Sequence, residues 1–220
     1  MYPIIISIKS TQLNINEKKN ISKFCPFGVI LFSRNISSFN QLNTLIKSIK
    51  SINKKINILI DQEGGMVNRF NSFPELKFSD NYDYYKIFLK HPSLAKQLVY
   101  LKSFITSFYL ARSGININTV PVLDIPNNNT VKMIKKRTFG SNTTINQILN
   151  NILVNTSIKF GVMPVMKHIP GHGLTNKDSH FYLPVSKASK STFEEFRRLS
   201  DANIQTLASN APNKFYEYKD

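Results

Sequence analysis

A length of 220 residues, with 41% hydrophobic and 19% charged residues, is typical of a folded globular domain and excludes wholesale disorder. The formal charge of +16 comes from scattered lysines, so it indicates a solvated basic surface, or attraction of a small anionic substrate, rather than a nucleic-acid site. One cysteine, no basic leader and no apolar run of about 20 residues predict a cytoplasmic protein without a disulfide or a membrane partner.

Five short apolar runs rich in β-branched residues predict buried strands of a parallel sheet. They span residues 3–8, 28–33, 56–61, 118–125 and 161–168.

Apolar residues at helical spacing fill three of the intervals between these strands. The stripes are Leu42, Leu45, Ile46 and Ile49 behind a Ser cap; Leu94, Leu98, Leu101, Ile105 and Phe108 before Gly114; and Ile145, Ile148, Leu149, Ile152 and Leu153. Near the end of the chain, Ser191 and Glu194 form a capping box that predicts a further helix.

Alternation of strand and helix predicts an α/β fold with a parallel sheet, either open and doubly wound or closed into a barrel. Polar residues follow four of the strands: Arg34-Asn35, Asp61-Gln62-Glu63, Asp124 and Lys167-His168. The carboxyl ends of barrel strands converge on one face, where several strands together build a site. This pattern favours the barrel, with residues 1–220 as one domain.

The stretch "DQEGG", residues 61–65, places a carboxylate at the end of a buried strand and two glycines after it. Glycines allow a sharp turn and a close approach of the backbone to a ligand. Taken alone, the stretch is better explained as an ordinary turn in which Asp61 caps nearby N–H groups.

The stretch "KHIPGHGLTNKDSH", residues 167–180, holds three of the four histidines of the chain. Pro170-Gly171 prevents a continuing helix, so His172 should lie on a loop and not on the helix face that an HExxH zinc motif requires. Asp178 and His180 are spaced so that the carboxylate can fold back on the imidazole and make it a general acid/base. A divalent-metal site and a hydrogen-bond network that pins the loop are the alternatives.

Three other residues are of types that could bind a ligand or react. Arg69 and Arg137 could make forked contacts to ligand oxygens, although a lone arginine is more often a surface residue. Cys25 lies between Phe24 and Pro26 with no companion motif, which favours a core residue over a nucleophile.

The segments "GVILFSRN", "LIDQEGGMVNRF", "PVLDI", "RTFGSN" and "KHIPGHGLTNKDSHFYLPV" occur in this order. Together they resemble bacterial β-N-acetylhexosaminidases of glycoside hydrolase family 3, over roughly residues 2–200. The resemblance implies a (β/α)8 TIM-type barrel, a retaining mechanism that removes terminal β-linked N-acetylglucosamine from muropeptides recovered in the cytoplasm, and no metal or other cofactor.

The resemblance also implies roles for individual residues. The acid/base dyad would be His180 with Asp178. The sugar-binding residues would be Asp61, Arg69, Arg137, Lys167 and His168. Asp61 would accept bonds from sugar hydroxyls, and the cationic side chains would hold the other hydroxyls and the acetamido group.

The chain departs from the family pattern in two places. The family usually has Arg where this chain has Met66. Its nucleophilic Asp lies on a later strand in a motif of the "FSDDL" kind, which nothing in the 220 residues matches, because Asp201 and Asp220 are the only aspartates after the dyad. With about five of eight βα units, the sheet should stay open, and its free edge predicts self-association. The alternative function is an inactive remnant that at most binds N-acetylglucosamine sugars.

Overall fold

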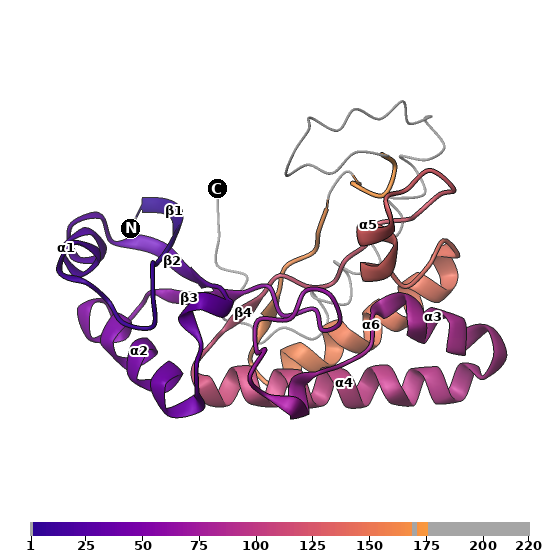
Figure 1. Cartoon of the computed structure of the whole chain (residues 1–220), viewed down its shortest axis with the longest axis horizontal. Helices are drawn as coiled ribbons and strands as arrows, with labels where there is room; N and C mark the ends of the chain where they lie inside the picture. The colour runs from indigo at the N-terminus through magenta and orange to yellow at the C-terminus, as the bar shows by residue number, and fades with distance from the viewer. Residues whose placement is uncertain (1, 169–170, 176–220) are drawn as a thin grey trace.

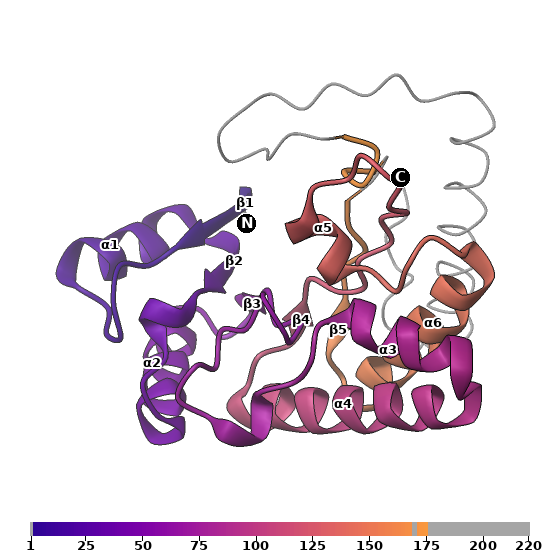
Figure 2. The same ribbon diagram turned by 45° about the vertical axis from the view of Figure 1, so that its right-hand side comes forward.

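The computed structural model describes residues 2–168 and 171–175. Within them five strands form one parallel sheet in the order β1-β2-β3-β4-β5, which confirms the α/β prediction (Figure 1; β5 is labelled in Figure 2). The strands are β1 (Tyr2–Ser7), β2 (Pro26–Leu31), β3 (Asn57–Ile60), β4 (Ile117–Asn118) and β5 (Met163–Pro164).

Helices connect the strands on the outside of the sheet. They are α1 (Ile15–Phe24), α2 (Phe39–Ile52), α3 (Asn81–Lys90), α4 (Pro92–Ser113), α5 (Lys132–Arg137) and α6 (Thr143–Lys159). In both views α1 and α2 lie at the β1 end of the sheet, and α3 and α6 lie at the other end, beside α4 (Figures 1 and 2). None of the described helices combines the length and apolarity needed to cross a membrane.

The helix α2 forms as its pattern predicts. The Ser38 hydroxyl accepts the Gln41 N–H at the first turn, and Leu42, Leu45, Ile46 and Ile49 are all buried against the sheet. The helix α6 begins at an Asn142 cap and buries Ile145, Leu149 and Leu153. Burial of these stripes accounts for most of their stability, because short isolated helices are marginal in water.

The predicted apolar stripe of α4 is only partly buried, with Leu98 and Ile105 packed against the core. Leu94, Leu101 and Phe108 are exposed, and the buried side carries Lys102, Ser103, Thr106 and Ser107 together with Ala95, Val99, Leu110 and Ser113. The helix itself is confirmed, with Gly114 in the left-handed conformation at its end. The side of the helix that packs on α3 and α6 is therefore mainly small and polar.

The predicted strands at 118–125 and 161–168 are much shorter than expected. Pro121 has no N–H, and the N–H of Val120 turns back to the Asn118 carbonyl, so the ladder stops after two residues. The two segments stay side by side, because the N–H of Leu123 donates to the Lys167 carbonyl over 2.7 Å.

The structure contains three helices that the sequence analysis did not predict, and it places one cysteine differently. The helices α1, α3 and α5 were not predicted, because no apolar stripe in the sequence indicates them. In α1 only Ile21 is buried, and a capping box between Asn14 and Glu17 stabilises its first turn. Cys25 is not a core residue, because it is half-buried at the left-handed end of α1, where its thiol donates to the Ser22 carbonyl. The helix predicted at Ser191 lies outside the described residues.

Candidate active site

The site lies where β3, β4 and the segment after β5 end side by side. In the sheet Ile60 pairs with Asn118, Asn118 pairs with Pro164, and Val122 bridges to Lys167. This register brings Asp61, which follows β3, close to Thr119, which follows β4. The carboxyl ends of the strands therefore build one cluster, as the sequence predicted.

The DQEGG turn folds back on itself after β3. The N–H groups of Glu63 and Gly64 both donate to the Val67 carbonyl, and both glycines have positive φ, 79° and 60°. A Cβ on Gly65 would lie 2.7 Å from the Asp80 Cα, so a side chain would not fit there. The turn returns Arg69 to the side of Asp61, where its Nη2 lies 3.3 Å from Oδ2.

Asp61 is bonded on both carboxylate oxygens. Oδ1 accepts from the Thr119 hydroxyl and from the Lys167 ammonium at 3.3 Å, and Oδ2 faces Arg69. Partial burial raises the pKa of the Asp61 carboxyl, but Lys167, Thr119 and Arg69 outweigh that effect and hold the pKa below its usual value. Asp61 is therefore an anion at neutral pH, which can accept hydrogen bonds from hydroxyl groups.

Glu63 is a buried carboxylate held by two cations. Arg137 donates to it through Nε and Nη2, over 2.9 and 2.8 Å, and the Lys167 ammonium lies 2.6 Å from Oε1. Burial alone would raise the pKa of Glu63, but these two cations lower it below its usual value. Glu63 thereby fixes the positions of Arg137 and Lys167, which come from distant parts of the chain.

Asp124 organises the loop that begins at His168. Its Oδ2 lies 2.6 Å from His168 Nδ1, and its Oδ1 accepts the N–H groups of His172 and Gly173. Burial raises the pKa of Asp124, but the imidazole and the two N–H donors together lower it. Asp124 accepts from Nδ1 of His168, and Nε2 of the same ring lies 3.5 Å from Nη2 of Arg137.

The charges of this cluster balance. Three carboxylates (Asp61, Glu63, Asp124) lie among three cationic side chains (Arg69, Arg137, Lys167), so the set suits a neutral, hydroxyl-rich ligand better than an anion. Among the described residues, no group of three or more His, Cys, Asp or Glu side chains could hold a metal ion.

All the predicted sugar-binding residues belong to this cluster: Asp61, Arg69, Arg137, Lys167 and His168. His172 lies on a loop, as predicted. The predicted dyad, Asp178 and His180, lies outside the described residues. Arg34 and Asn35, which also follow a strand, instead donate to the Ile8 carbonyl and hold the segment after β1.

Sequence reasoning did not assign roles to Glu63, Asp124 or Thr119, all of which the structure places in the cluster. Two signals were present. Glu63 is two residues after Asp61 in an extended segment, so both side chains point to the same side. Asp124 ends an apolar run near the fourth strand, and a buried carboxylate there must find partners.

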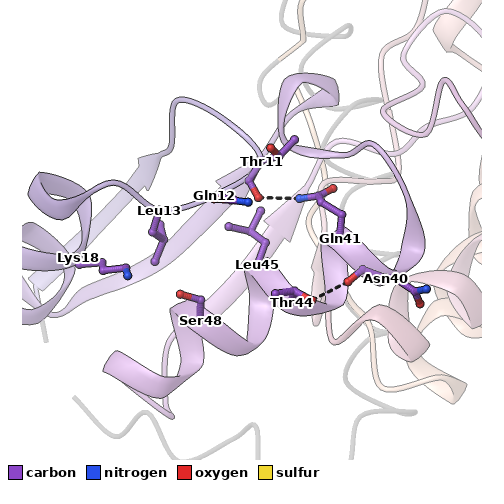
Figure 3. A pocket seen from close by; sticks show the side chains of 9 residues that line it. All are labelled: Thr11, Gln12, Leu13, Lys18, Asn40, Gln41, Thr44, Leu45 and Ser48. Atoms are coloured by element: carbon purple, nitrogen blue, oxygen red, sulfur yellow. Dashed lines mark hydrogen bonds between the residues drawn. The ribbon is translucent and has the colours of Figure 1, made fainter.

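A separate pocket of about 550 Å³ lies between the segment after β1 and α2 (Figure 3). The Gln41 side chain crosses toward Thr11 and donates to its carbonyl over 2.7 Å. Lys18 is the one charged residue that lines it. This pocket contains none of the clustered carboxylates and is distinct from the candidate site.

Comparison with known proteins agrees with the geometry. The model of the glycosyl hydrolase family 3 N terminal domain matches residues 5–202. A beta-hexosaminidase of Nitrosospira multiformis is 31% identical over 197 residues, which are 87% of this chain and 55% of that protein. The chain therefore spans little more than half the length of this relative.

Two solved structures of NagZ from Neisseria gonorrhoeae are similar at 28% identity, each over 94% of this chain and 60% of the other. One is a complex with N-trifluoroacetyl-D-glucosamine, with a TM-score of 0.82, and the other is a complex with a zinc ion, with a TM-score of 0.81. These matches confirm the predicted barrel-type α/β fold, of which the described residues form part. The chain belongs to glycosyl hydrolase family 3, and most of its length corresponds to the N-terminal domain of that family.

Proposed function

We propose that the chain binds terminal β-linked N-acetylglucosamine and takes part in its hydrolysis with retention of configuration. The observation that carries this proposal is the interlocked cluster of Asp61, Glu63, Arg137 and Lys167 at the carboxyl ends of the strands. The name of the Nitrosospira relative and the bound sugar analogue of the Neisseria enzyme support the choice of ligand.

The five clustered residues would share the recognition of the sugar. Asp61, held as an anion, accepts hydrogen bonds from sugar hydroxyls, while Arg69 and Lys167 donate to other hydroxyl oxygens. Arg137 and His168 lie side by side and would receive the acetamido group and the neighbouring hydroxyl. Because each cation already has a carboxylate partner, little reorganisation accompanies binding.

The proton would be handled by His180, with Asp178 setting the tautomer and basicity of its ring. His180 donates a proton to the glycosidic oxygen as the C1–O bond breaks, and later takes a proton from the water that attacks C1. A retaining reaction also needs a carboxylate that bonds to C1 between these steps. No metal has a role in this scheme. Muropeptides in the cytoplasm are the proposed source of the substrate.

A second function, sugar binding without turnover, is favoured by the described cluster, whose side chains are groups that can hold a sugar. Binding depends on the described cluster, whereas turnover needs the additional carboxylate.

Two measurements on the purified chain separate these functions. N-acetylglucosamine is titrated into the ¹⁵N-labelled chain with EDTA present, and release of 4-nitrophenol from its aryl β-glycoside is followed in parallel. Binding with turnover that His180→Ala abolishes supports hydrolysis, and binding without turnover supports the second function. Absence of binding, or equal binding by Asp61→Asn, would overturn both.

A further inference from the structure

Lys102 is a cation enclosed in the protein behind the DQEGG turn. It is 4% exposed and projects from the inward polar side of α4. No carboxylate of the described residues lies within ion-pair distance of its ammonium group, which instead donates to the Asn81 Oδ1 over 2.6 Å and lies 5.2 Å from the centre of the Tyr84 ring. A buried ammonium with a neutral partner is costly, so its presence calls for an explanation.

Asn81 connects Lys102 to the candidate site through a second hydrogen bond. Its Nδ2 donates to the backbone carbonyl of Arg137 over 2.8 Å, and the guanidinium of the same Arg137 donates to the Glu63 carboxylate. Asn81 is buried at the first turn of α3. A cation on the amide oxygen polarises the amide and strengthens donation from its nitrogen. Polar contacts therefore join Lys102 to Asn81 and Asn81 to the Arg137 backbone, and the Arg137 side chain extends the link to Glu63.

Lys102 also touches the turn directly. A Cβ on Gly64 would lie 2.9 Å from the Lys102 Cε, so the methylene stem of the lysine lies against the turn backbone. The neighbouring Asp80 holds the opposite side of the turn, because its carboxylate accepts the Met66 N–H over 2.9 Å. Lys102 of α4 and Asp80, which precedes α3, thus both support the turn.

We propose that Lys102 and Asn81 are positioning residues that set Arg137 and the Glu63 turn in the geometry required for sugar binding. This inference rests on the proposed function. It assigns a role to two residues that lie behind the five clustered side chains.

The surroundings of Lys102 make its charged form unfavourable, which indicates that this lysine serves the site and does not stabilise the fold. Burial lowers its pKa to about 8, although Glu63 and Asp80 act in the opposite direction. Tyr84 is the other titratable group facing it, and the side chains around it on α4 and α6 are the hydroxyls of Ser103, Thr106 and Ser157. The environment therefore disfavours the cation, and an apolar residue of similar length should suit the fold better.

The test uses Lys102→Met and Asn81→Asp, with Lys96→Met on the exposed side of α4 as the matched control. Asn81→Asp gives Lys102 a charged partner but removes the donor to the Arg137 carbonyl. We expect both variants to keep or raise the thermal midpoint and to weaken N-acetylglucosamine binding by roughly tenfold or more. Lys96→Met should match the parent in both measurements.

A purely structural lysine would give a lower midpoint for Lys102→Met and unchanged affinity in both variants, and this result would overturn the inference. If the parent chain binds no sugar, the proposed function fails first. The positioning role is then read from the ¹³C resonance of the Glu63 carboxyl without ligand. It should move in both variants and not in the control, and an unmoved resonance would refute the role.

Discussion

The ammonium group of Lys167 lies 2.6 Å from Oε1 of Glu63, which joins the segment after β5 to the turn after β3. The same nitrogen lies 3.3 Å from Oδ1 of Asp61. Lys167 therefore spans both carboxylates of the turn, and its side chain is only 16% exposed. The candidate site depends on this cation for its geometry as well as for its charge.

Replacing Lys167 with Met should destabilise the fold and abolish sugar binding. The change leaves Glu63 buried with Arg137 as its only cation, and removing one partner of a buried charge network lowers the free energy of unfolding by about 2–4 kcal/mol. Urea denaturation at pH 7 measures this loss. The control is Lys86→Met, which breaks an exposed ion pair with Asp83 and should leave the urea midpoint unchanged.

Replacing Asp124 with Asn should loosen the loop at 171–175. The amide oxygen can still accept the N–H groups of His172 and Gly173, but the charged bond to His168 is lost. We expect a loss of about 1–3 kcal/mol in the free energy of unfolding, because a charge-assisted bond becomes a neutral one. Faster amide exchange at Gly173 than in the parent is the local measurement, and unchanged exchange would contradict the role given to Asp124.

The three carboxylates predict a loss of stability in acid. The pKa values of Asp61, Glu63 and Asp124 are all lowered in the folded chain, so the unfolded chain binds more protons as the pH falls. Their contribution is present in full above pH about 5 and is lost as the pH falls through about 4 and below. Urea midpoints between pH 7 and pH 3 test this, and Asp124→Asn should show a smaller decline than the parent.

The arrangement of the site was predictable because parallel strands impose it. Asp61 and Lys167 are far apart in the sequence, but each follows a strand of one sheet, and the ends of such strands meet. Glu63 was not predicted as their partner, because its two-residue spacing from Asp61 indicates a shared side only if the backbone stays extended, and the glycines that follow predict a turn. Its two glycines signalled a turn but not its direction.

The fold was predictable to a similar extent. The pattern of α2 has one apolar side, which has to be buried, so Leu42 and Ile49 were placed correctly. In α4 the buried side includes Lys102 and Ser107, and Leu101 of the predicted stripe is exposed, so the periodicity predicts the helix but not which of its residues are buried. The polar side chains of α4 are buried because they bond to polar groups of α3 and α6, such as Asn81 and Ser157, which come from distant segments.

The lowered pKa of Lys102 predicts a gain of stability in mild alkali. The unfolded lysine has its ordinary pKa of 10.5, whereas burial lowers the pKa of Lys102 to about 8, so the unfolded chain binds more protons between these values. The free energy of unfolding should rise with pH from 8 to about 10, by up to about 3 kcal/mol. Lys102→Met should remove this rise.

The measurement is urea denaturation at closely spaced pH values from 7 to 10. Above pH 10 the raised pKa of Tyr84 acts in the opposite direction, since the folded chain then holds the extra proton, so that range is left out. A stability that falls steadily from pH 8 to 10 in the parent would show that Lys102 is not the buried cation described.

The edge strand β1 should cause the chain to self-associate. Among the described strands β1 pairs only with β2, and its side chains Tyr2, Ile4 and Ile5 are 57%, 45% and 50% exposed. An unpaired parallel edge beside exposed apolar side chains offers both backbone hydrogen bonds and apolar area to a second copy. We expect Ile5→Lys to reduce the average mass measured by light scattering at a given protein concentration. Leu101→Lys, on the exposed apolar side of α4, is the matched comparison, and if it alone reduced the mass, association would run through that helix and not through the sheet edge.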